Sequence, residues 1–258
     1  MPDFDVSAPA FDRYRGLPPG VPESIRSAIL TSISAVPRPW VLDLGAGTGR
    51  IGKAFVDAGD AYIGVDLSQA MLREFGASTG ATGRRIGCLV QADGTQLPFR
   101  DATFDVVLLI QVLSGARRWR RLLDEVRRVL KAGGNIAVGR VVAPPAGIDA
   151  QLKNRLAIIL EEMGVDLQEP GKGREEEALS WLRSVSRQME SVVVASWTAD
   201  RTPREFMARH RTGAHFAALP APIQEEALQR LSAWAEAHFG SLDASFPELH
   251  AFELHIFG

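Results

Sequence analysis

Hydrophobic positions along this chain form short continuous runs separated by segments with helical spacing. The runs, which are typical of strands buried in a parallel sheet, cover residues 40–44, 61–65, 85–91, 104–110 and 135–142. The segments between them place apolar residues three and four positions apart, as amphipathic helices do, for example over residues 117–130. Regular alternation of strand and helix predicts a doubly wound, mostly parallel α/β sheet.

The rest of the chain adds helices and two further strands. The same spacing predicts helices over residues 22–35, 148–163, 174–189, 203–210 and 222–239, and apolar runs predict strands over 191–197 and 248–257. Prolines at positions 2, 9, 18, 19 and 22 forbid a continuous helix at the N-terminus and indicate an extended arm. This arm either anchors the terminus or covers a ligand.

The stretch W-V-L-D-L-G-A-G-T-G-R joins the first strand to a helix through a glycine-rich turn. Gly45, Gly47 and Gly49 recur at alternate positions. Glycine adopts φ > 0 readily and lets a ligand approach bare backbone. A strand, a glycine turn and a helix N-terminus together form the part of an α/β sheet that binds nucleotides.

An acidic residue, Asp66, follows the second strand. Its distance from Gly49 is close to the roughly 20-residue spacing at which an acid binds ribose hydroxyls in dinucleotide folds. The alternative is an acid favoured by the helix dipole, worth only about 0.3–1 kcal/mol, and Ser68 is placed to cap that helix. Because the glycine turn already predicts a nucleotide at this crevice, the ribose role is favoured.

Four segments, in order between residues 38 and 142, resemble a known family. They read V-L-D-L-G-A-G-T-G-R, V-D-L-S-Q-A-M-L, A-D-G-T-Q-L-P-F-R-D-A-T-F-D-V-V and R-V-L-K-A-G-G-N. Together they resemble the class I S-adenosylmethionine-dependent methyltransferases (methyltransferase type 11), in particular the small-molecule branch similar to the ubiquinone and menaquinone biosynthesis C-methyltransferases. The turn reads G-A-G-T-G rather than G-x-G-x-x-G, which disfavours a dinucleotide oxidoreductase.

The resemblance implies a Rossmann-like, doubly wound and mostly parallel seven-stranded sheet with an antiparallel last strand and a helical cap. No repeat, linker or low-complexity segment divides the chain, so a single methyltransferase domain over residues 1–258 is expected. Within it, residues 1–35 would form the arm and first helix, 36–142 the cofactor-binding half, and 143–258 a cap insertion with the C-terminal half.

S-adenosyl-L-methionine is the cofactor that the resemblance implies, with S-adenosyl-L-homocysteine as product. Gly45, Ala46 and Gly47 would pass under its methionine part, and Asp43 would support that turn. The candidate cofactor-binding residues are Tyr14, Asp43, Gly45, Ala46, Gly47, Asp66, Leu67, Asp93, Gly94 and Gln111.

The remaining roles follow from the resemblance in the same way. Asp66 would accept hydrogen bonds from both ribose hydroxyls, and Leu67 would press on the adenine. Asp93 would accept from the adenine amino group while the Gly94 amide donates to a ring nitrogen. Gln111, directly after the fourth strand, would border the sulfonium and the substrate. Each role suits the donors and acceptors available.

The segment after the fourth strand reads Q-V-L-S-G-A-R-R-W and lacks an obvious acid or base. Methyl transfer from a sulfonium is an in-line displacement, so holding the nucleophile close and aligned can supply much of the rate. The acceptor atom can be O, N or C, and the catalytic residues are unknown. A non-catalytic binding protein of the same fold is the alternative.

Polar residues that could face a substrate gather between residues 197 and 215. They are Trp197, Arg201, Arg204, Arg209, His210, Arg211, Thr212 and His215. Among these, His210 and His215 are weak candidates for a general base, because histidine changes its charge near neutral pH. His238, His250 and His255 are assigned to surface or strand positions.

Composition and charge limit the possible partners. The 258 residues are 46% hydrophobic, and 29 basic against 31 acidic side chains give a net charge near −2, which indicates a small-molecule acceptor rather than nucleic acid. The arginines of 117–130 are interpreted as a solvated face paired with acids of the same helix. No membrane span, signal or metal site is predicted, and the single Cys88 is expected to be buried, so a cytoplasmic location is expected.

Overall fold

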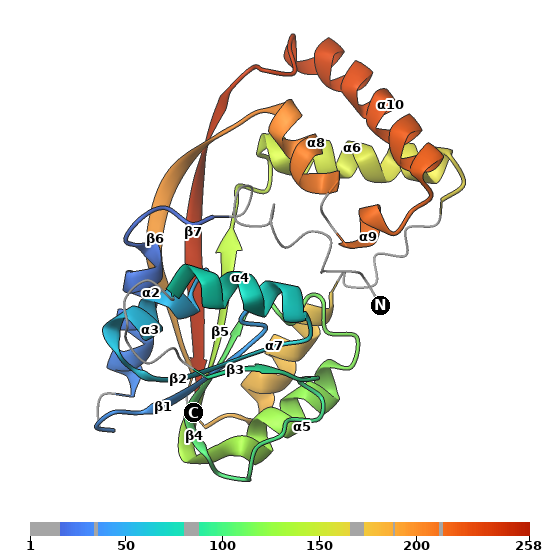
Figure 1. Ribbon diagram of the computed structural model, residues 1–258. Coiled ribbons are helices and arrows are strands. Elements are labelled where there is room, and N and C mark those ends of the chain that lie inside the picture. The colour runs from blue at the N-terminus through green and yellow to red at the C-terminus, as the bar shows by residue number, and fades with distance from the viewer. Residues whose placement is uncertain (1–15, 34–35, 80–87, 166–172, 188, 212–213) are drawn as a thin grey trace. The chain divides into compact units, whose positions relative to one another are not determined.

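A computed structural model describes residues 16–33, 36–79, 88–165, 173–187, 189–211 and 214–258 (Figure 1). The predicted N-terminal arm up to residue 15, with Tyr14, and the first residues of the third strand, 85–87, lie outside these ranges. The chain divides into two compact units. Within the described residues, the sheet unit comprises 17–141, 173–195 and 252–258, and the helical unit comprises 142–165 and 196–251. That all of them form one domain stays a prediction.

Seven strands form a single sheet in the described part of the chain. They are β1 (Trp40–Leu44), β2 (Ala61–Asp66), β3 (Cys88–Gln91), β4 (Phe104–Ile110), β5 (Leu130–Val142), β6 (Met189–Arg201) and β7 (Phe246–Phe257). Their order is β3-β2-β1-β4-β5-β7-β6. Strands β1 to β5 pair in parallel and the last strands are antiparallel, so the predicted doubly wound, mostly parallel sheet is confirmed.

The register of the parallel strands brings their carboxyl ends to one edge of the sheet. Leu44 lies beside Val65, and Asp66 lies beside Gln91 at the end of β3. On the other side of β1, Asp43 pairs with Leu108, two residues before β4 ends. The loops that carry the predicted cofactor-binding residues therefore begin at the same edge, where open α/β sheets bind ligands.

Helices cover both faces of the sheet unit. Helices α2 (Val21–Ser32), α3 (Gly52–Ala58) and α4 (Gln69–Thr79) lie over one face, while α5 (Trp119–Val129) and α7 (Arg174–Val185) pack on the other (Figure 1). Strand β4 lies in the middle, and all seven of its residues are buried. This double coverage explains why β4 is a continuous apolar run rather than an alternating one.

Several predicted boundaries are wrong. Helix α5 ends at Val129, and Leu130 is already extended and pairs with Phe104, so β5 begins at residue 130 rather than at the predicted residue 135. Helix α7 ends at Val185, which is exposed, rather than at the predicted residue 189. Cys88, expected to be buried, is exposed because β3 is a short strand at the edge of the sheet.

The helical unit contains three of the predicted helices, α6 (Ile148–Glu162), α8 (Pro203–Arg211) and α10 (Ala221–Phe239). It also contains the short helix α9 (Ala214–Ala217), which the sequence did not predict. Leu152, Leu156, Leu228 and Leu231 are fully or almost fully buried in a shared apolar core, which holds α6, α8 and α10 together. None of the described helices is long and apolar enough to cross a membrane.

Candidate cofactor-binding site

The glycine turn after β1 needs glycine for both conformation and space. Gly45 and Gly49 have φ of +77° and +86°, a region that side chains other than glycine rarely adopt. A Cβ on Gly45 would lie 2.6 Å from Val112 Cγ2, and one on Gly49 would lie 2.2 Å from Phe75 Cδ2. At Gly47 the nearest atom to such a Cβ is 3.9 Å away, so this part of the turn is open to a ligand.

The turn is tied to the neighbouring strand by backbone hydrogen bonds. The N–H groups of Gly45 and Ala46 both donate to the carbonyl of Val65, at 2.8 and 3.0 Å. Ala46 itself is buried. The end of β2 therefore fixes the path of the turn, and it brings Asp66 beside the open backbone of Gly47.

Asp66 bridges the glycine turn and the start of α4. Its Oδ2 accepts the N–H of Gly47 and its Oδ1 accepts the N–H of Ser68, both at 2.9 Å. Ser68 Oγ in turn accepts the N–H of Met71 at 3.1 Å, so the predicted N-cap is confirmed. The carboxylate of Asp66 thus shapes the turn and lies at the position where a ribose was predicted.

Asp43 lies beneath the turn rather than on its surface. Its carboxyl is 3% exposed and accepts a hydrogen bond from Tyr62 Oη at 2.7 Å. Burial raises the pKa of Asp43 to about 6, against the hydrogen bond from Tyr62, and the nearby charge of Asp66 adds to the increase. Asp43 is therefore a buried support whose charge changes close to neutral pH.

Asp93 follows β3 and keeps its charge. Its Oδ1 accepts the N–H of Thr95 at 2.8 Å, and this bond is the main reason why the pKa of Asp93 lies below its ordinary value. Its Oδ2 accepts from Arg118 Nη2 at 3.0 Å, a pair that is largely solvent-exposed and hence weak. The next residue, Gly94, packs close to Leu122. Sequence reasoning missed Arg118, because helical spacing gives no information about contacts between separate elements.

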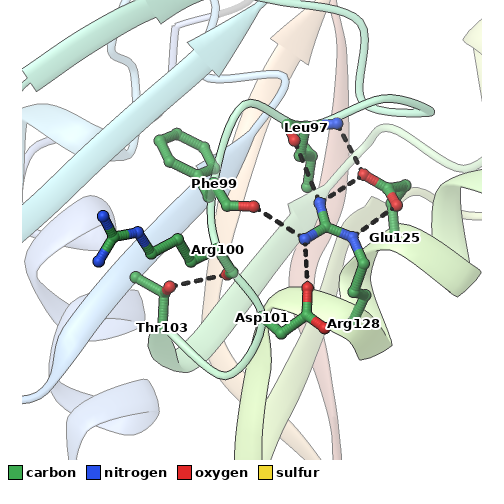
Figure 2. A network of polar contacts seen from close by, with 7 residues as sticks. All are labelled: Leu97, Phe99, Arg100, Asp101, Thr103, Glu125 and Arg128. Carbon is green, nitrogen blue, oxygen red and sulfur yellow. Dashed lines mark hydrogen bonds and ion pairs between the residues drawn. The ribbon is translucent and has the colours of Figure 1, made fainter.

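The loop after Gly94 is fixed by one arginine (Figure 2). Arg128 of α5 donates to the carbonyls of Leu97 and Phe99, at 3.1 and 2.8 Å, and to Asp101 at 2.7 Å. It also forms two 2.8 Å bonds to Glu125, whose other contact is the N–H of Leu97 at 2.7 Å. Mainly because of the Arg128 bonds, the pKa of Glu125 falls to about 2.

This network explains residues of the third motif that sequence reasoning had left without a role. The arginines of this helix were predicted to pair with its own acids, and Arg128 does pair with Glu125, but it also binds the loop (Figure 2). The L-P-F-R-D segment is thereby held against α5, and this anchors the chain that leaves Asp93 and Gly94.

Leu67 and Gln111 complete this group of residues at the edge of the sheet. Leu67 is 46% exposed beside Asp66, so its side chain is accessible to a ligand ring. Gln111 has φ of +56°, which is rare for a residue with a side chain, and its N–H donates to Gly139 O at 2.8 Å. Its side-chain oxygen accepts from Arg50, a contact that the sequence did not predict.

The two histidines considered as bases, His210 and His215, belong to the helical unit rather than to the sheet unit. His210 lies in α8 of the helical unit, where its ring stacks on Phe206 at 5.1 Å and meets Phe216 edge-on at 5.4 Å. The side chain of His215, like Tyr14, is outside the described part of the structure. The other cofactor candidates all lie in the sheet unit, where the register brings them to one edge.

The polar and apolar groups at this edge of the sheet fit S-adenosylmethionine. Open backbone at Gly47 lies next to the acceptor Asp66, an exposed apolar side chain follows it, and a second ionised acceptor, Asp93, lies after the adjacent strand. These are the partners that an amino acid group, a ribose, and an adenine with its amino group require.

Comparison with known proteins finds a family that matches part of the chain. Residues 42–138 match the family described as "Methyltransferase domain". These residues, which contain the four motifs except Val41, are therefore similar to the methyltransferase domains of class I S-adenosylmethionine-dependent enzymes, as the motifs predicted.

The chain is also similar in sequence or in structure to individual proteins. The demethylmenaquinone methyltransferase of Clavibacter sepedonicus is 36% identical over 143 residues, which are 55% of this chain and 58% of that protein. The chain thus matches less than two thirds of the length of such relatives. The YcgJ protein of Bacillus subtilis has a TM-score of 0.58 at 21% identity, over 91% of this chain and 97% of that chain.

A further structural neighbour was solved with a product of methyl transfer. The phosphoethanolamine N-methyltransferase 2 of Haemonchus contortus, in complex with S-adenosylhomocysteine, has a TM-score of 0.53 at 16% identity. The similarity covers 99% of this chain and 59% of that chain. At such identities, the two structures establish the shared fold.

Proposed function

We propose that this protein transfers the methyl group of S-adenosylmethionine to an O, N or C nucleophile of a small molecule. The observation that carries the proposal is the group of residues at the carboxyl ends of β1 to β4, where Asp66 bridges the Gly47 and Ser68 amides beside the exposed Leu67. These residues belong to the range 42–138, which matches the family described as "Methyltransferase domain".

When bound, the cofactor supplies an electrophilic methyl group on a sulfonium, with a neutral thioether as leaving group. The chain's contribution is to hold the donor and exclude alternative orientations. Gly45, Ala46 and Gly47 are fixed by β2, and Gln111 is fixed through Gly139, so the backbone around the reacting end is rigid. Proximity and alignment are therefore the main source of rate, since in-line displacement needs little more.

The relatives suggest which acceptors to test first. Several are named demethylmenaquinone methyltransferases, so reduced naphthoquinones are natural first choices, followed by simple phenols and amines. A small-molecule acceptor, rather than nucleic acid, stays our prediction from the near-neutral charge, and so does a cytoplasmic location.

Calorimetry with S-adenosylhomocysteine is the first test. We expect saturable one-to-one binding that Asp66→Ala weakens and that Asp124→Ala, an exposed acid on α5, leaves unchanged. Absence of binding to the unaltered protein would overturn the proposal.

Transfer of a labelled methyl group to the acceptor series separates the enzyme from a non-catalytic binding protein of the same fold. A methylated product with any acceptor would exclude that alternative, which the comparisons give no reason to favour. Binding without product across the series would instead support it.

A further inference from the structure

Six arginines crowd the segment that forms α5 and the turn before it. Within residues 117–128 they outnumber the two acids, Asp124 and Glu125, so the segment has a net charge of +4 in a chain whose net charge is −2. The arginines were expected to pair with acids of the same helix, which would leave an ordinary solvated surface. The structure confirms only part of that expectation.

Two of the six arginines form ion pairs. Arg128 binds Glu125 and Asp101, while Arg118 binds Asp93, which lies outside the helix. No ion pair within the described residues involves the other four, which are Arg117, Arg120, Arg121 and Arg127. All four are exposed, and we call them the arginine surface.

Two guanidinium groups of the arginine surface lie over indole rings. Arg120 Cζ is 4.3 Å from the centre of the Trp119 ring, and Arg127 Cζ is 5.7 Å from that of Trp181 on α7. The two indoles meet edge-on, with ring centroids 6.2 Å apart. Because an aromatic face attracts a cation, both arginines are held against the protein while their side chains stay exposed.

An exposed apolar side chain lies next to this surface. Val185 comes one turn after Trp181 on α7, so the two share a side of that helix, and Val185 is 43% exposed. Glu177, one turn before Trp181, is an exposed acid at the other end of the same row. Basic, aromatic and aliphatic groups therefore lie together on the neighbouring helices α5 and α7, within the sheet unit.

The positive charge is placed where a helix tolerates it least. Arg120 and Arg121 lie in the first turn of α5, and Arg117 and Arg118 directly precede it. That turn contains no acid, although the positive end of the helix dipole favours acids and disfavours cations. Asp124, about one turn later, is exposed beside them. An anionic partner would therefore stabilise this end of the helix.

We propose that the arginine surface docks on a lipid bilayer that contains anionic phospholipids, with Trp181 and Val185 in contact with the headgroups. Clusters of four or more basic residues on a helix bind such bilayers through charge. Tryptophan is enriched at the membrane–water interface. The apolar face of α5 is packed in the core of the sheet unit, so the helix lies on the bilayer surface and does not insert.

The composition of the surface favours a bilayer over nucleic acid. Exposed apolar groups at the headgroup boundary add to the electrostatic attraction of a membrane, whereas they add nothing to contacts with the phosphates of a duplex. Lipid headgroups also move, so they adapt to arginines whose positions are fixed by indole rings. A duplex presents its phosphates at fixed spacing.

Vesicle co-sedimentation tests the inference on the protein without cofactor. We expect binding to vesicles of phosphatidylcholine mixed with phosphatidylglycerol, and none to vesicles of phosphatidylcholine alone. Salt at about 1 M should release the protein, because charges are then screened within about 3 Å. No binding to the mixed vesicles, equal binding to both kinds, or binding that salt leaves unchanged would overturn the inference.

A triple variant locates the binding surface. Arg117→Gln, Arg120→Gln and Arg127→Gln together should weaken binding to the mixed vesicles roughly 100-fold, since each basic residue near an anionic bilayer contributes about fivefold. Arg121 is kept because its charge also acts on Asp93. Far-UV circular dichroism should be unchanged, which shows that the loss is not a loss of fold.

A second triple variant controls for net charge. Lys153→Gln, Arg204→Gln and Arg230→Gln remove the same charge from exposed positions of the helical unit. Vesicle binding should then change by less than about twofold, because these side chains are not in the docking surface. Equal losses in the two triple variants would overturn the inference.

A single substitution tests the surface without removing the arginine–indole contacts. Val185→Glu places an acid beside Trp181 and should weaken vesicle binding about fivefold. Ile158→Glu, at a side chain on α6 that is 46% exposed, should leave binding unchanged. Equal vesicle binding by the two variants would contradict the docking surface.

Competition with DNA separates the bilayer from the other anionic partner. A short duplex, added at the same phosphate concentration as the anionic lipid, should leave the protein on the vesicles. If the duplex displaces the protein, the arginine surface belongs to nucleic acid and the inference fails. Because no step requires cofactor, a protein that binds vesicles but not S-adenosylhomocysteine would overturn only the proposed function.

Discussion

Replacing Asp66 tests whether this residue binds the proposed cofactor. In the structure its carboxylate accepts two backbone N–H groups, from Gly47 and Ser68, both at 2.9 Å. Hydrogen bonds to a charged group contribute about 1.5–3 kcal/mol each. If Asp66 also holds the ribose, Asp66→Ala should weaken S-adenosylhomocysteine binding by about 1.5–3 kcal/mol, or roughly 10- to 150-fold.

The same substitution should also lower stability, because it leaves two amide donors of the turn without their acceptor. We expect the free energy of unfolding to fall by about 1–3 kcal/mol. Asp66→Asn keeps the shape and one acceptor oxygen, so its effects on both quantities should be smaller. Calorimetry measures the affinity and urea unfolding measures the stability, with Asp124→Ala as control.

A ligand without ribose hydroxyls distinguishes the two roles of Asp66. The 2′,3′-dideoxy analogue of S-adenosylhomocysteine should bind the unaltered protein more weakly, but Asp66→Ala should then cost it little more. Such non-additivity is the mark of a direct interaction. Equal losses with both ligands would refute the ribose assignment and leave Asp66 as a support of the turn and helix.

Three further outcomes are expected. Gly49→Ala should lower the free energy of unfolding, measured with urea, by about 2–5 kcal/mol, because both the positive φ and the buried ring of Phe75 oppose a Cβ there. The control Gly59→Ala has a similar φ but open space around the new Cβ, so it should lower the same free energy by only about 1–2 kcal/mol. Glu125→Gln should lower the free energy of unfolding by about 1–2 kcal/mol at pH 7. Because the pKa of Glu125 is lowered to about 2, the difference in stability between the two proteins should disappear as pH falls from about 4.5 toward 2. A difference that persists at low pH would contradict the ion pair. Tyr62→Phe removes the hydrogen bond that lowers the pKa of Asp43, so a carboxyl NMR titration should give a pKa above about 6, and an unchanged value would count against that bond.

The sheet and its glycine turn could be predicted because their causes are local. A buried parallel strand is apolar along its whole length, as β4 is, and a turn with φ > 0 selects glycine, as at Gly45. The boundary between α5 and β5 was misplaced because the strand begins where Leu130 finds a partner on β4, and pairing across the sheet overrides local propensity.

The contacts between distant residues could not be read from the sequence. His250 was placed correctly on a strand, but its burial and its stacking on Trp197 depend on how β7 pairs with β6. Arg118 with Asp93, and Arg50 with Gln111, are likewise joined only by the fold. Charge patterns along one helix therefore indicate which residues are polar without indicating what they bind.

The arginine that holds the loop after Gly94 also determines how this part of the molecule opens. Arg128 connects the last turn of α5 to the carbonyls of Leu97 and Phe99, so the loop cannot separate unless that turn gives up its contacts at the same time. Cooperative opening of this kind is measured by amide hydrogen exchange. The Leu97 amide and those of the last turn of α5 should then exchange with one common opening free energy, so the loop after Gly94 is only as stable as a helix end some 30 residues further along the chain.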